Sequence, residues 1–170
     1  VAIFMGVICY VAVSAIDLDF LSEHRFLLVL FNLFLLLLLI PFGVDFESGN
    51  KSWLDLPGVP FSIQPAEICK ITFVLIMASV MAAHQQRISS VRSVITMLFQ
   101  TLLLVGTNIA ISRDAGVSLI FVFIFIGMAF AGGVSLVWFL LGGGALVAAA
   151  PVIWTKVMSE YQRSRILVLF

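Results

Sequence analysis

Long apolar runs alternate with shorter polar stretches along the 170-residue chain. A bilayer core about 30 Å thick is crossed by about 20 residues of helix, so runs of roughly that length predict membrane-spanning helices. Six runs meet this description, several at the short end: residues 1–16, 26–42, 66–84, 94–112, 115–131 and 134–154. The pattern therefore predicts an all-α fold, a polytopic transmembrane helix bundle with about six spans in a single domain.

The composition agrees with this interpretation. Hydrophobic residues make up 62% of the chain and charged residues 11%, whereas soluble domains have about 45–50% apolar and about 25% charged residues. Lipid is therefore the expected surrounding of most side chains. The formal net charge is zero, which argues against a nucleic-acid partner, because such proteins present a basic face.

The two cysteines do not indicate redox or metal chemistry. Cys9 and Cys69 each lie inside an apolar run, without the even spacing of a disulfide framework or the clustering of a zinc site. We interpret both as packing residues and predict no metal site.

Both ends of the chain lie in apolar sequence. Val1 opens a run without an initiator methionine, a basic segment or a small-residue cleavage site, so a helix cut within its span is expected rather than a signal peptide. Phe170 ends the chain without a polar tail. We expect a piece of a longer protein.

Two polar segments, residues 43–65 and 155–170, are longer than the other connections. An even number of predicted spans separates them, so both are expected on one side of the membrane. That side carries Lys51, Arg113, Lys156, Arg163 and Arg165, and the other side carries Arg25, Arg87 and Arg92. Because cytoplasmic loops are usually enriched in lysine and arginine, the count alone puts the long segments in the cytoplasm. Cations kept outside to hold an anionic ligand would reverse this assignment.

The entry into the third predicted span carries two charges. Pro65 suits a first helical turn, where its missing N–H costs no hydrogen bond, and Glu67 is favoured there by the helix dipole. Lys70, one turn further, opposes the dipole and requires an anion beside an apolar run. Either Glu67 supplies that anion in an ordinary ion pair, or a phosphate binds at the helix N-terminus.

Three motifs carry a resemblance to a known family. WLDL at 53–56, a glycine-containing hairpin and QPAE at 64–67, followed by Lys70, resemble the signature of the SEDS family (shape, elongation, division and sporulation), which includes RodA, FtsW and SpoVE-like proteins. SRDAGV at 112–117 resembles the family's Pro-Asp-Leu-Gly-Thr turn, with three replacements. YQRSRIL at 161–167 resembles its Tyr-Gln-Arg-x-Arg-Ile stretch. The hairpin slightly favours the elongation (RodA) type.

The resemblance implies a bacterial inner-membrane protein with a ten-helix bundle whose large loops lie outside the cytoplasm. Residues 43–65 and 155–170 would then be outer loops. The implied activity is that of a peptidoglycan glycosyltransferase, which polymerises the disaccharide of lipid II and releases undecaprenyl pyrophosphate. Its implied partners are lipid II, membrane lipid and a class B penicillin-binding transpeptidase.

The resemblance and the charges together suggest substrate-binding or supporting residues. Cations suited to a pyrophosphate are Lys51, Lys70, Arg163 and Arg165, and acidic candidates are Glu67 and Asp114. Trp53 and Asp55 are weaker candidates, since an interfacial anchor and a turn cap are their ordinary roles. Asp114 is equally explained as part of a tight turn, and the two arginines by contact with lipid headgroups. The cofactor is unknown, with a divalent cation as one option.

The family's proposed catalytic aspartate follows the Tyr-Gln-Arg-x-Arg-Ile stretch and would lie beyond Phe170. The catalytic base is therefore not identified, and residues 1–170 alone are predicted to be inactive. Two other functions stay open. Charges such as Glu67 and Lys70 would equally suit a path for flipping lipid II, and the bundle could instead be a scaffold for the transpeptidase.

Overall fold

The computed structural model describes residues 6–7, 10–11, 14, 23–45, 50–55 and 62–152. It divides into two compact units, Val1–Gly132 and Gly133–Phe170. Most of the first expected span lies outside the described residues. So do Lys156, Arg163, Arg165 and the whole YQRSRIL stretch.

In the first unit, the apolar run 26–42 forms two consecutive helices rather than one. Helix α3 covers Arg25–Leu37 and α4 covers Leu39–Phe42. Pro41 explains the break, because proline has no N–H to donate and its ring clashes with the carbonyl four residues earlier, that of Leu37. Leu38 keeps helical dihedral angles (φ −60°, ψ −22°), so the two helices together form one membrane-length segment.

Helix α5 covers Pro65–Ala83, close to the expected run, and Pro65 stands in its first turn. The short 3-10 helix η1 (Gln85–Arg87) leads into α6, which covers Val91–Ser112. Helix α6 starts three residues before the expected run 94–112 because of its cap. The Ser90 hydroxyl accepts a hydrogen bond from the N–H of Ser93, the third residue of the helix, at 3.3 Å.

Helix α7 covers Ala115–Ala131, as expected from the sequence, and follows α6 after two residues. In the second unit, α8 covers Leu136–Val152 within the expected run 134–154. The fold class predicted from the apolar runs, a bundle of apolar helices, is confirmed.

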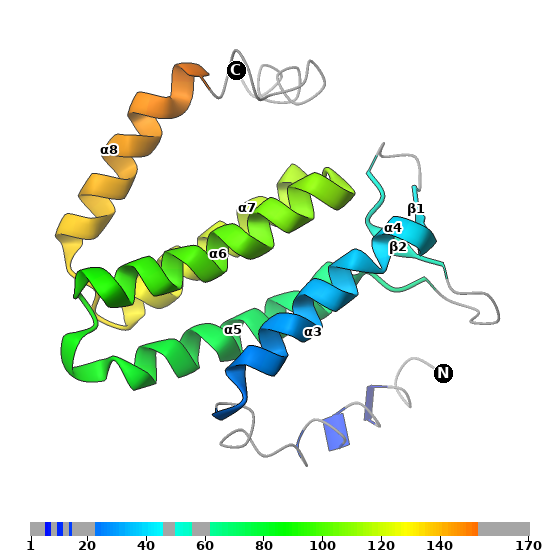
Figure 1. Cartoon of the computed structure of the whole chain (residues 1–170), viewed down its shortest axis with the longest axis horizontal. Helices are drawn as coiled ribbons and strands as arrows, with labels where there is room; N and C mark the ends of the chain where they lie inside the picture. Colours follow the sequence, from blue (N-terminus) through cyan, green and yellow to red (C-terminus); the bar gives the residue numbers. More distant parts are fainter. Residues whose placement is uncertain are drawn as a thin grey trace. The chain divides into compact units, whose positions relative to one another are not determined.

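In the described part of the first unit, the four long helices α3, α5, α6 and α7 pack side by side (Figure 1). Helix α3 packs mainly on α5, α6 packs mainly on α7, and α5 also contacts α6 and α7. At the core, the rings of Phe73 in α5 and Phe121 in α7 meet edge to face, with centroids 5.6 Å apart. Leu36, Ile76, Met77 and Met97 are also buried.

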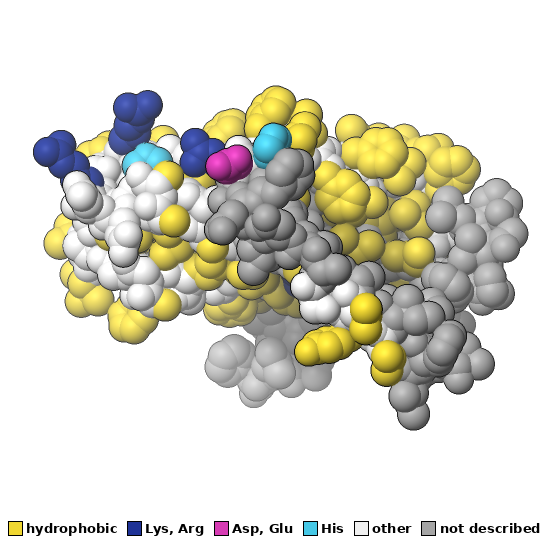
Figure 2. Space-filling model, turned by 90° about the horizontal axis from the view of Figure 1, so that it is seen from below, with side chains coloured by type: hydrophobic (Ala, Val, Ile, Leu, Met, Phe, Trp, Pro, Cys, Tyr) yellow, Lys and Arg dark blue, Asp and Glu magenta, His cyan; other side chains and the backbone are white. Residues whose placement is uncertain are grey.

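The outer surface of these helices is also apolar. Large hydrophobic side chains are exposed on every long helix, for example Phe34, Ile71, Phe99 and Phe123, and Figure 2 shows such side chains over much of the face it presents. A soluble protein rarely exposes so much apolar surface. Three segments, Arg25–Phe42, α5 and α6, are long and apolar enough to cross a membrane, and α7 and α8 are shorter apolar helices.

Two short strands organise the connection between α4 and α5. Strand β1 (Gly43–Val44) pairs antiparallel with β2 (Trp53–Leu54), with Gly43 opposite Leu54. On its other side, Leu54 exchanges two backbone hydrogen bonds with Ile63, at 2.8 and 3.1 Å. The beginning, middle and end of the connection are therefore tied together at the end of the bundle where α5 begins.

Candidate functional site

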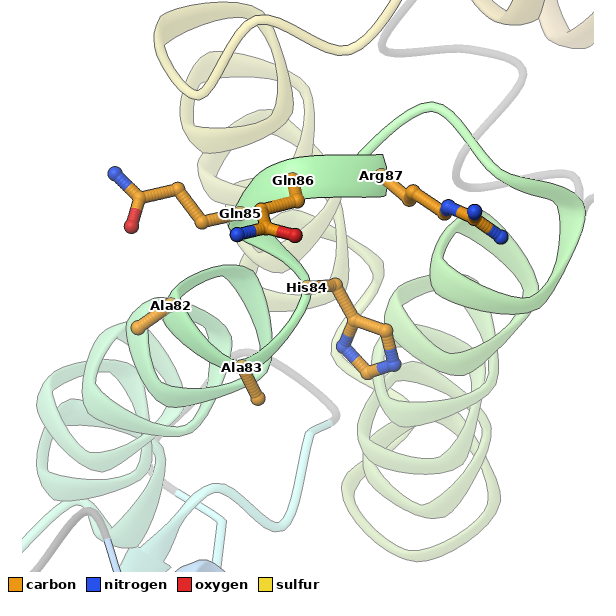
Figure 3. A pocket seen from close by; sticks show the side chains of 6 residues that line it. All are labelled: Ala82, Ala83, His84, Gln85, Gln86 and Arg87. Carbon is orange, nitrogen blue, oxygen red and sulfur yellow. The ribbon is translucent and has the colours of Figure 1, made fainter.

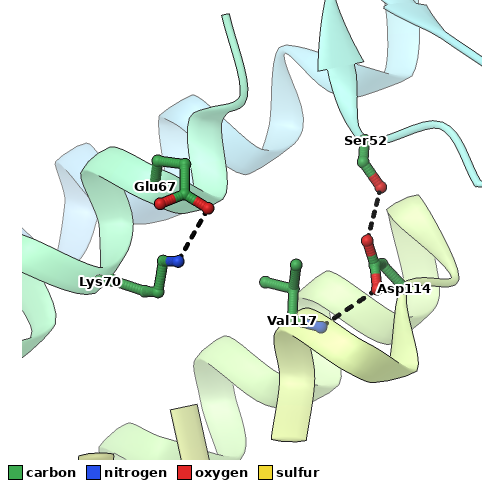
Figure 4. A network of polar contacts seen from close by, with 5 residues as sticks. All are labelled: Ser52, Glu67, Lys70, Asp114 and Val117. Atoms are coloured by element: carbon green, nitrogen blue, oxygen red, sulfur yellow. Dashed lines mark hydrogen bonds and ion pairs between the residues drawn. The ribbon is translucent and has the colours of Figure 1, made fainter. Parts of the chain in front are cut away.

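The first turn of α5 carries an ion pair at the edge of the apolar helix. The Lys70 Nζ atom lies 2.8 Å from the Glu67 Oε1 atom (Figure 4). Lys70 is the more buried partner, with 20% of its side chain exposed against 57% for Glu67. Glu67 therefore supplies the anion that a lysine near a helix N-terminus requires. Because Glu67 is largely exposed, the acidic side of the pair is accessible from outside the bundle.

Asp114 caps α7 and also holds the α4–α5 connection. Its Oδ1 atom accepts a hydrogen bond from the Val117 N–H, and its Oδ2 atom accepts one from the Ser52 hydroxyl, both at 3.1 Å (Figure 4). Aspartate is among the preferred residues for this N-cap position. Ser52 is buried and lies 62 residues earlier in the chain. Both carboxylate oxygens thus have donors within the protein.

Buried Asn108 in α6 holds the same turn from inside. Its Nδ2 atom donates to the Asp114 carbonyl oxygen at 3.1 Å and to the Ser118 hydroxyl at 2.9 Å. Its Oδ1 atom accepts from the Ser112 hydroxyl at 3.0 Å. Asn108, Ser112, Ser118 and also Ser52 were not among the predicted site residues. The first three lie within or at the end of apolar runs, where a polar side chain needs a partner in a membrane, whereas Ser52 lies in the polar segment 43–65.

The turn between α6 and α7 depends on an unusual backbone conformation. Arg113, the C-cap of α6, has φ 58° and ψ 20°. These angles lie in the left-handed region, which residues other than glycine rarely adopt. Proline is fixed near φ −65°, so the proline of the family motif could not adopt this conformation. Arg113, one of the three replacements in the motif, therefore stands at a position whose conformation here excludes proline.

The segment around Trp53 alternates between exposed and buried side chains. Lys51, Trp53 and Asp55 are exposed, whereas Ser52 and Leu54 are buried, with 5% and 4% exposed. This alternation is that of an extended chain. Three predicted site residues therefore share the outer face of the connection.

These features gather at one end of the bundle. The end of α4, the start of α5 and the α6–α7 turn lie together there (Figure 1), and the Ser52–Asp114 bond links them. The structure thus brings Glu67, Lys70, Asp114 and the exposed face of the connection to one end. The remaining predicted cations, Arg163 and Arg165, lie outside the described residues.

A pocket lies at the opposite end, where α5 stops. It has a volume of about 420 Å³ and is lined by Ala82, Ala83, His84, Gln85, Gln86 and Arg87 (Figure 3). The His84 Nδ1 atom lies 2.8 Å from the Val80 carbonyl oxygen, which holds the ring against its own helix. All lining residues belong to the continuous segment 82–87, from the end of α5 through η1, so groups from distant parts of the chain do not converge here. Among the described residues, no group of three or more histidine, cysteine or acidic side chains could hold a metal ion.

Comparison with known proteins shows to which family the chain belongs. The model of the FtsW, RodA and SpoVE family, described as "Cell cycle protein", matches residues 1–170. The chain belongs to this family. A "Probable peptidoglycan glycosyltransferase FtsW" of Trichlorobacter lovleyi is 31% identical over 96% of this chain and 43% of its own length. A "Peptidoglycan glycosyltransferase MrdB" of Escherichia coli K12 is 29% identical over 97% of this chain and 43% of its own length.

A solved structure shares the fold of this FtsW/RodA/SpoVE-family chain. It is described as "Structural coordination of polymerization and crosslinking by a peptidoglycan synthase complex" and matches with a TM-score of 0.78 and 25% identity, over 98% of this chain and 48% of that chain. The chain thus spans less than half the length of the relatives it matches. Together with the apolar helices, family membership makes it a multi-pass membrane protein. Relatives named FtsW and MrdB match almost equally, so the preference for the RodA type stays a prediction.

Proposed function

We propose that the full product of the reading frame encoding this chain is a peptidoglycan glycosyltransferase of the bacterial inner membrane, which polymerises lipid II into glycan strands. One observation carries this proposal. The relatives named as peptidoglycan glycosyltransferases are 29–31% identical over 96–97% of the chain. The likeness therefore includes the α5 entry, the α4–α5 connection and the α6–α7 turn.

Glycosyl transfer from a lipid-linked pyrophosphate needs a base and a cationic surface. The acceptor hydroxyl oxygen bonds to the anomeric carbon as a base removes its proton, and the bond from that carbon to the pyrophosphate oxygen breaks with its electrons leaving on the phosphate. Lys51 is exposed and Lys70 is held in place by Glu67, so both are suited to the leaving pyrophosphate. Arg163 and Arg165 would join them.

The proton acceptor is not assigned to a described residue. Both oxygens of Asp114 already accept hydrogen bonds, and Glu67 is paired with Lys70. These contacts favour supporting roles for the two carboxylates, in positioning the connection and the lysine. In this proposal the end of the bundle that carries the α4–α5 connection faces the outside of the cell.

A class B transpeptidase is the partner that fits this function. The solved structure that matches the chain is described as a synthase complex that coordinates polymerization and crosslinking. Crosslinking needs freshly made strands, so an enzyme that joins their peptides would work beside the polymerase. Co-purification of the full product with such a transpeptidase from membranes tests the pairing, and recovery of each protein without the other would contradict it.

Reconstitution tests the activity. The purified full product is placed in vesicles with lipid II, and glycan chains are resolved by length. We expect ladders without any added polymerase. Movement of labelled lipid II across the bilayer without ladders would instead support the flippase function and refute the polymerase.

One lysine variant and one arginine variant make this test more specific. Lys70→Met is expected to slow ladder formation by at least about tenfold, because one positive group next to the leaving phosphate is lost. Arg92→Met removes a cation at the start of α6, at the opposite end of the bundle, and should leave the rate within about twofold. A scaffold function predicts that neither Lys70→Met nor Glu67→Gln alters cell shape at normal membrane levels.

A further inference from the structure

Residues 51–55 of the α4–α5 connection form an extended segment with an exposed and a buried side. The register in which this segment pairs determines which side chains are exposed. Lys51, Trp53 and Asp55 are exposed, and Ser52 and Leu54 are buried. In an extended chain, a shift of one residue turns every side chain to the opposite side. A shifted connection would expose Ser52 and Leu54 and turn the charged and aromatic side chains inwards.

The backbone pairing alone is weak protection against such a shift. Strands β1 and β2 have two residues each, and one pair of hydrogen bonds joins Leu54 to Ile63. Strands this short lie below the usual range of three to ten residues. Backbone hydrogen bonds can also re-form in a neighbouring register, because every residue offers the same groups.

The bond from Ser52 to Asp114 is specific to one register. The Ser52 hydroxyl lies 3.1 Å from the Asp114 Oδ2 atom, and a shift by one residue would bring Lys51 or Trp53 to this buried position. The acceptor itself is firmly placed. Asp114 caps α7 through the Val117 N–H, and its carbonyl oxygen accepts from Asn108.

We propose that Ser52 and Asp114 form a register lock that keeps Lys51, Trp53 and Asp55 on the outer face of the bundle end. Asp114 is then a positioning residue, which acts on the outward side chains through Ser52. What this face contacts rests on the proposed function. A cation, an aromatic ring and a carboxylate in a row about 13 Å long suit the phosphate and sugar groups of a lipid-linked saccharide.

Cysteine accessibility tests the lock without any activity. Leu54→Cys and Asp55→Cys are made singly in the full product, and their labelling by a membrane-impermeant maleimide is compared in membranes, with the unmodified protein as background. We expect the cysteine at 55 to react quickly and the cysteine at 54 slowly. Adding Ser52→Ala should raise the labelling rate at 54 about tenfold, since a hydrogen bond to a charged group is lost.

Matched variants separate the lock from general loosening. Ser52→Thr keeps the hydroxyl and should restore slow labelling at 54. Ser62→Ala removes a hydroxyl from the same connection without touching the Ser52–Asp114 bond, and should have little effect. Asp114→Ala should act like Ser52→Ala. Equal effects of Ser52→Ala and Ser62→Ala, or fast labelling at 54 before any change at Ser52, would overturn the lock.

A kinetic measurement tests the link to the substrate. If the outer face binds lipid II, Ser52→Ala should raise KM for lipid II about tenfold with kcat within about twofold, and Ser52→Thr should restore KM. An unchanged KM would refute the contact with substrate. If the unmodified full product forms no glycan chains, the proposed polymerase function is refuted. The labelling experiment still tests the register lock, because it does not depend on activity.

Discussion

Removing one charge of the Glu67–Lys70 pair at a time should destabilise the protein unequally. The two side chains differ in burial, since 20% of Lys70 is exposed against 57% of Glu67. Glu67→Gln leaves a largely buried ammonium group without its anion at the start of an apolar helix. Lys70→Met leaves a carboxylate that water can solvate, in the first turn where the helix dipole favours it. We therefore expect the glutamine variant to be the less stable one.

The size of each effect follows from the environment. An unpaired buried charge near the membrane edge costs about 1–3 kcal/mol, whereas an exposed pair three residues apart on a helix contributes only about 0.2–0.5 kcal/mol. Thermal unfolding of the purified full product in detergent measures the difference. A change of about 1 kcal/mol shifts the Tm of a domain with 150–250 residues by roughly 2–4 °C, and the shift is smaller in a longer protein such as the full product. Glu67→Gln should therefore lower Tm by about 1–4 °C and Lys70→Met by less than about 1 °C.

The double variant tests whether the unpaired ammonium group of Lys70 causes the loss of stability. With Lys70→Met already present, Glu67→Gln should cost almost nothing further, because no buried cation is left to compensate. Equal losses for the two single variants, or a larger loss for Lys70→Met, would mean that Lys70 has another anion. Lys70→Met should also combine nearly normal stability with slow glycan polymerisation, which separates a binding role from a structural one.

Three further changes should alter Tm. Arg113→Gly relieves the left-handed conformation (φ 58°) and should add about 1 kcal/mol, whereas Arg113→Val should not. Gly132→Ala would place a methyl group against the Met81 side chain and should cost about 1 kcal/mol; Gly127→Ala, which meets open space, is its control. Asn108→Ala removes three hydrogen bonds at a buried position and should cost about 1–2 kcal/mol. An unchanged Tm would contradict each argument.

The helices could be predicted because the lipid environment strictly limits which segments can cross it. A spanning segment has to satisfy its own backbone and present apolar side chains, so long runs such as 66–84 become helices. Local signals then fixed several helix ends, as Pro65 does for α5. Helix α6 begins before the apolar run 94–112 because its cap, Ser90, lies among polar residues.

The partners within the candidate site could only partly be predicted. Glu67 and Lys70 are one helical turn apart, so their contact follows from spacing alone. The Ser52–Asp114 bond joins residues 62 positions apart, and a serine in a polar loop carries no signal of that contact. Strands of two residues also lack a periodic pattern that could be recognised. The same limit applies to Asn108, whose three hydrogen bonds depend on how α6 and α7 pack.

The sidedness of the bundle depends on which cations enter the count. The count that places the long segments in the cytoplasm includes Lys156, Arg163 and Arg165, which lie outside the described residues. Among the described residues, Lys51, Lys70 and Arg113 lie at the end with the α4–α5 connection, and Arg25, Arg87 and Arg92 lie at the other. For this part of the chain, the positive-inside rule therefore favours neither end. The outward orientation needed for a lipid-linked substrate then conflicts with charge only through the last residues, where cations next to a pyrophosphate would have a reason to stay outside.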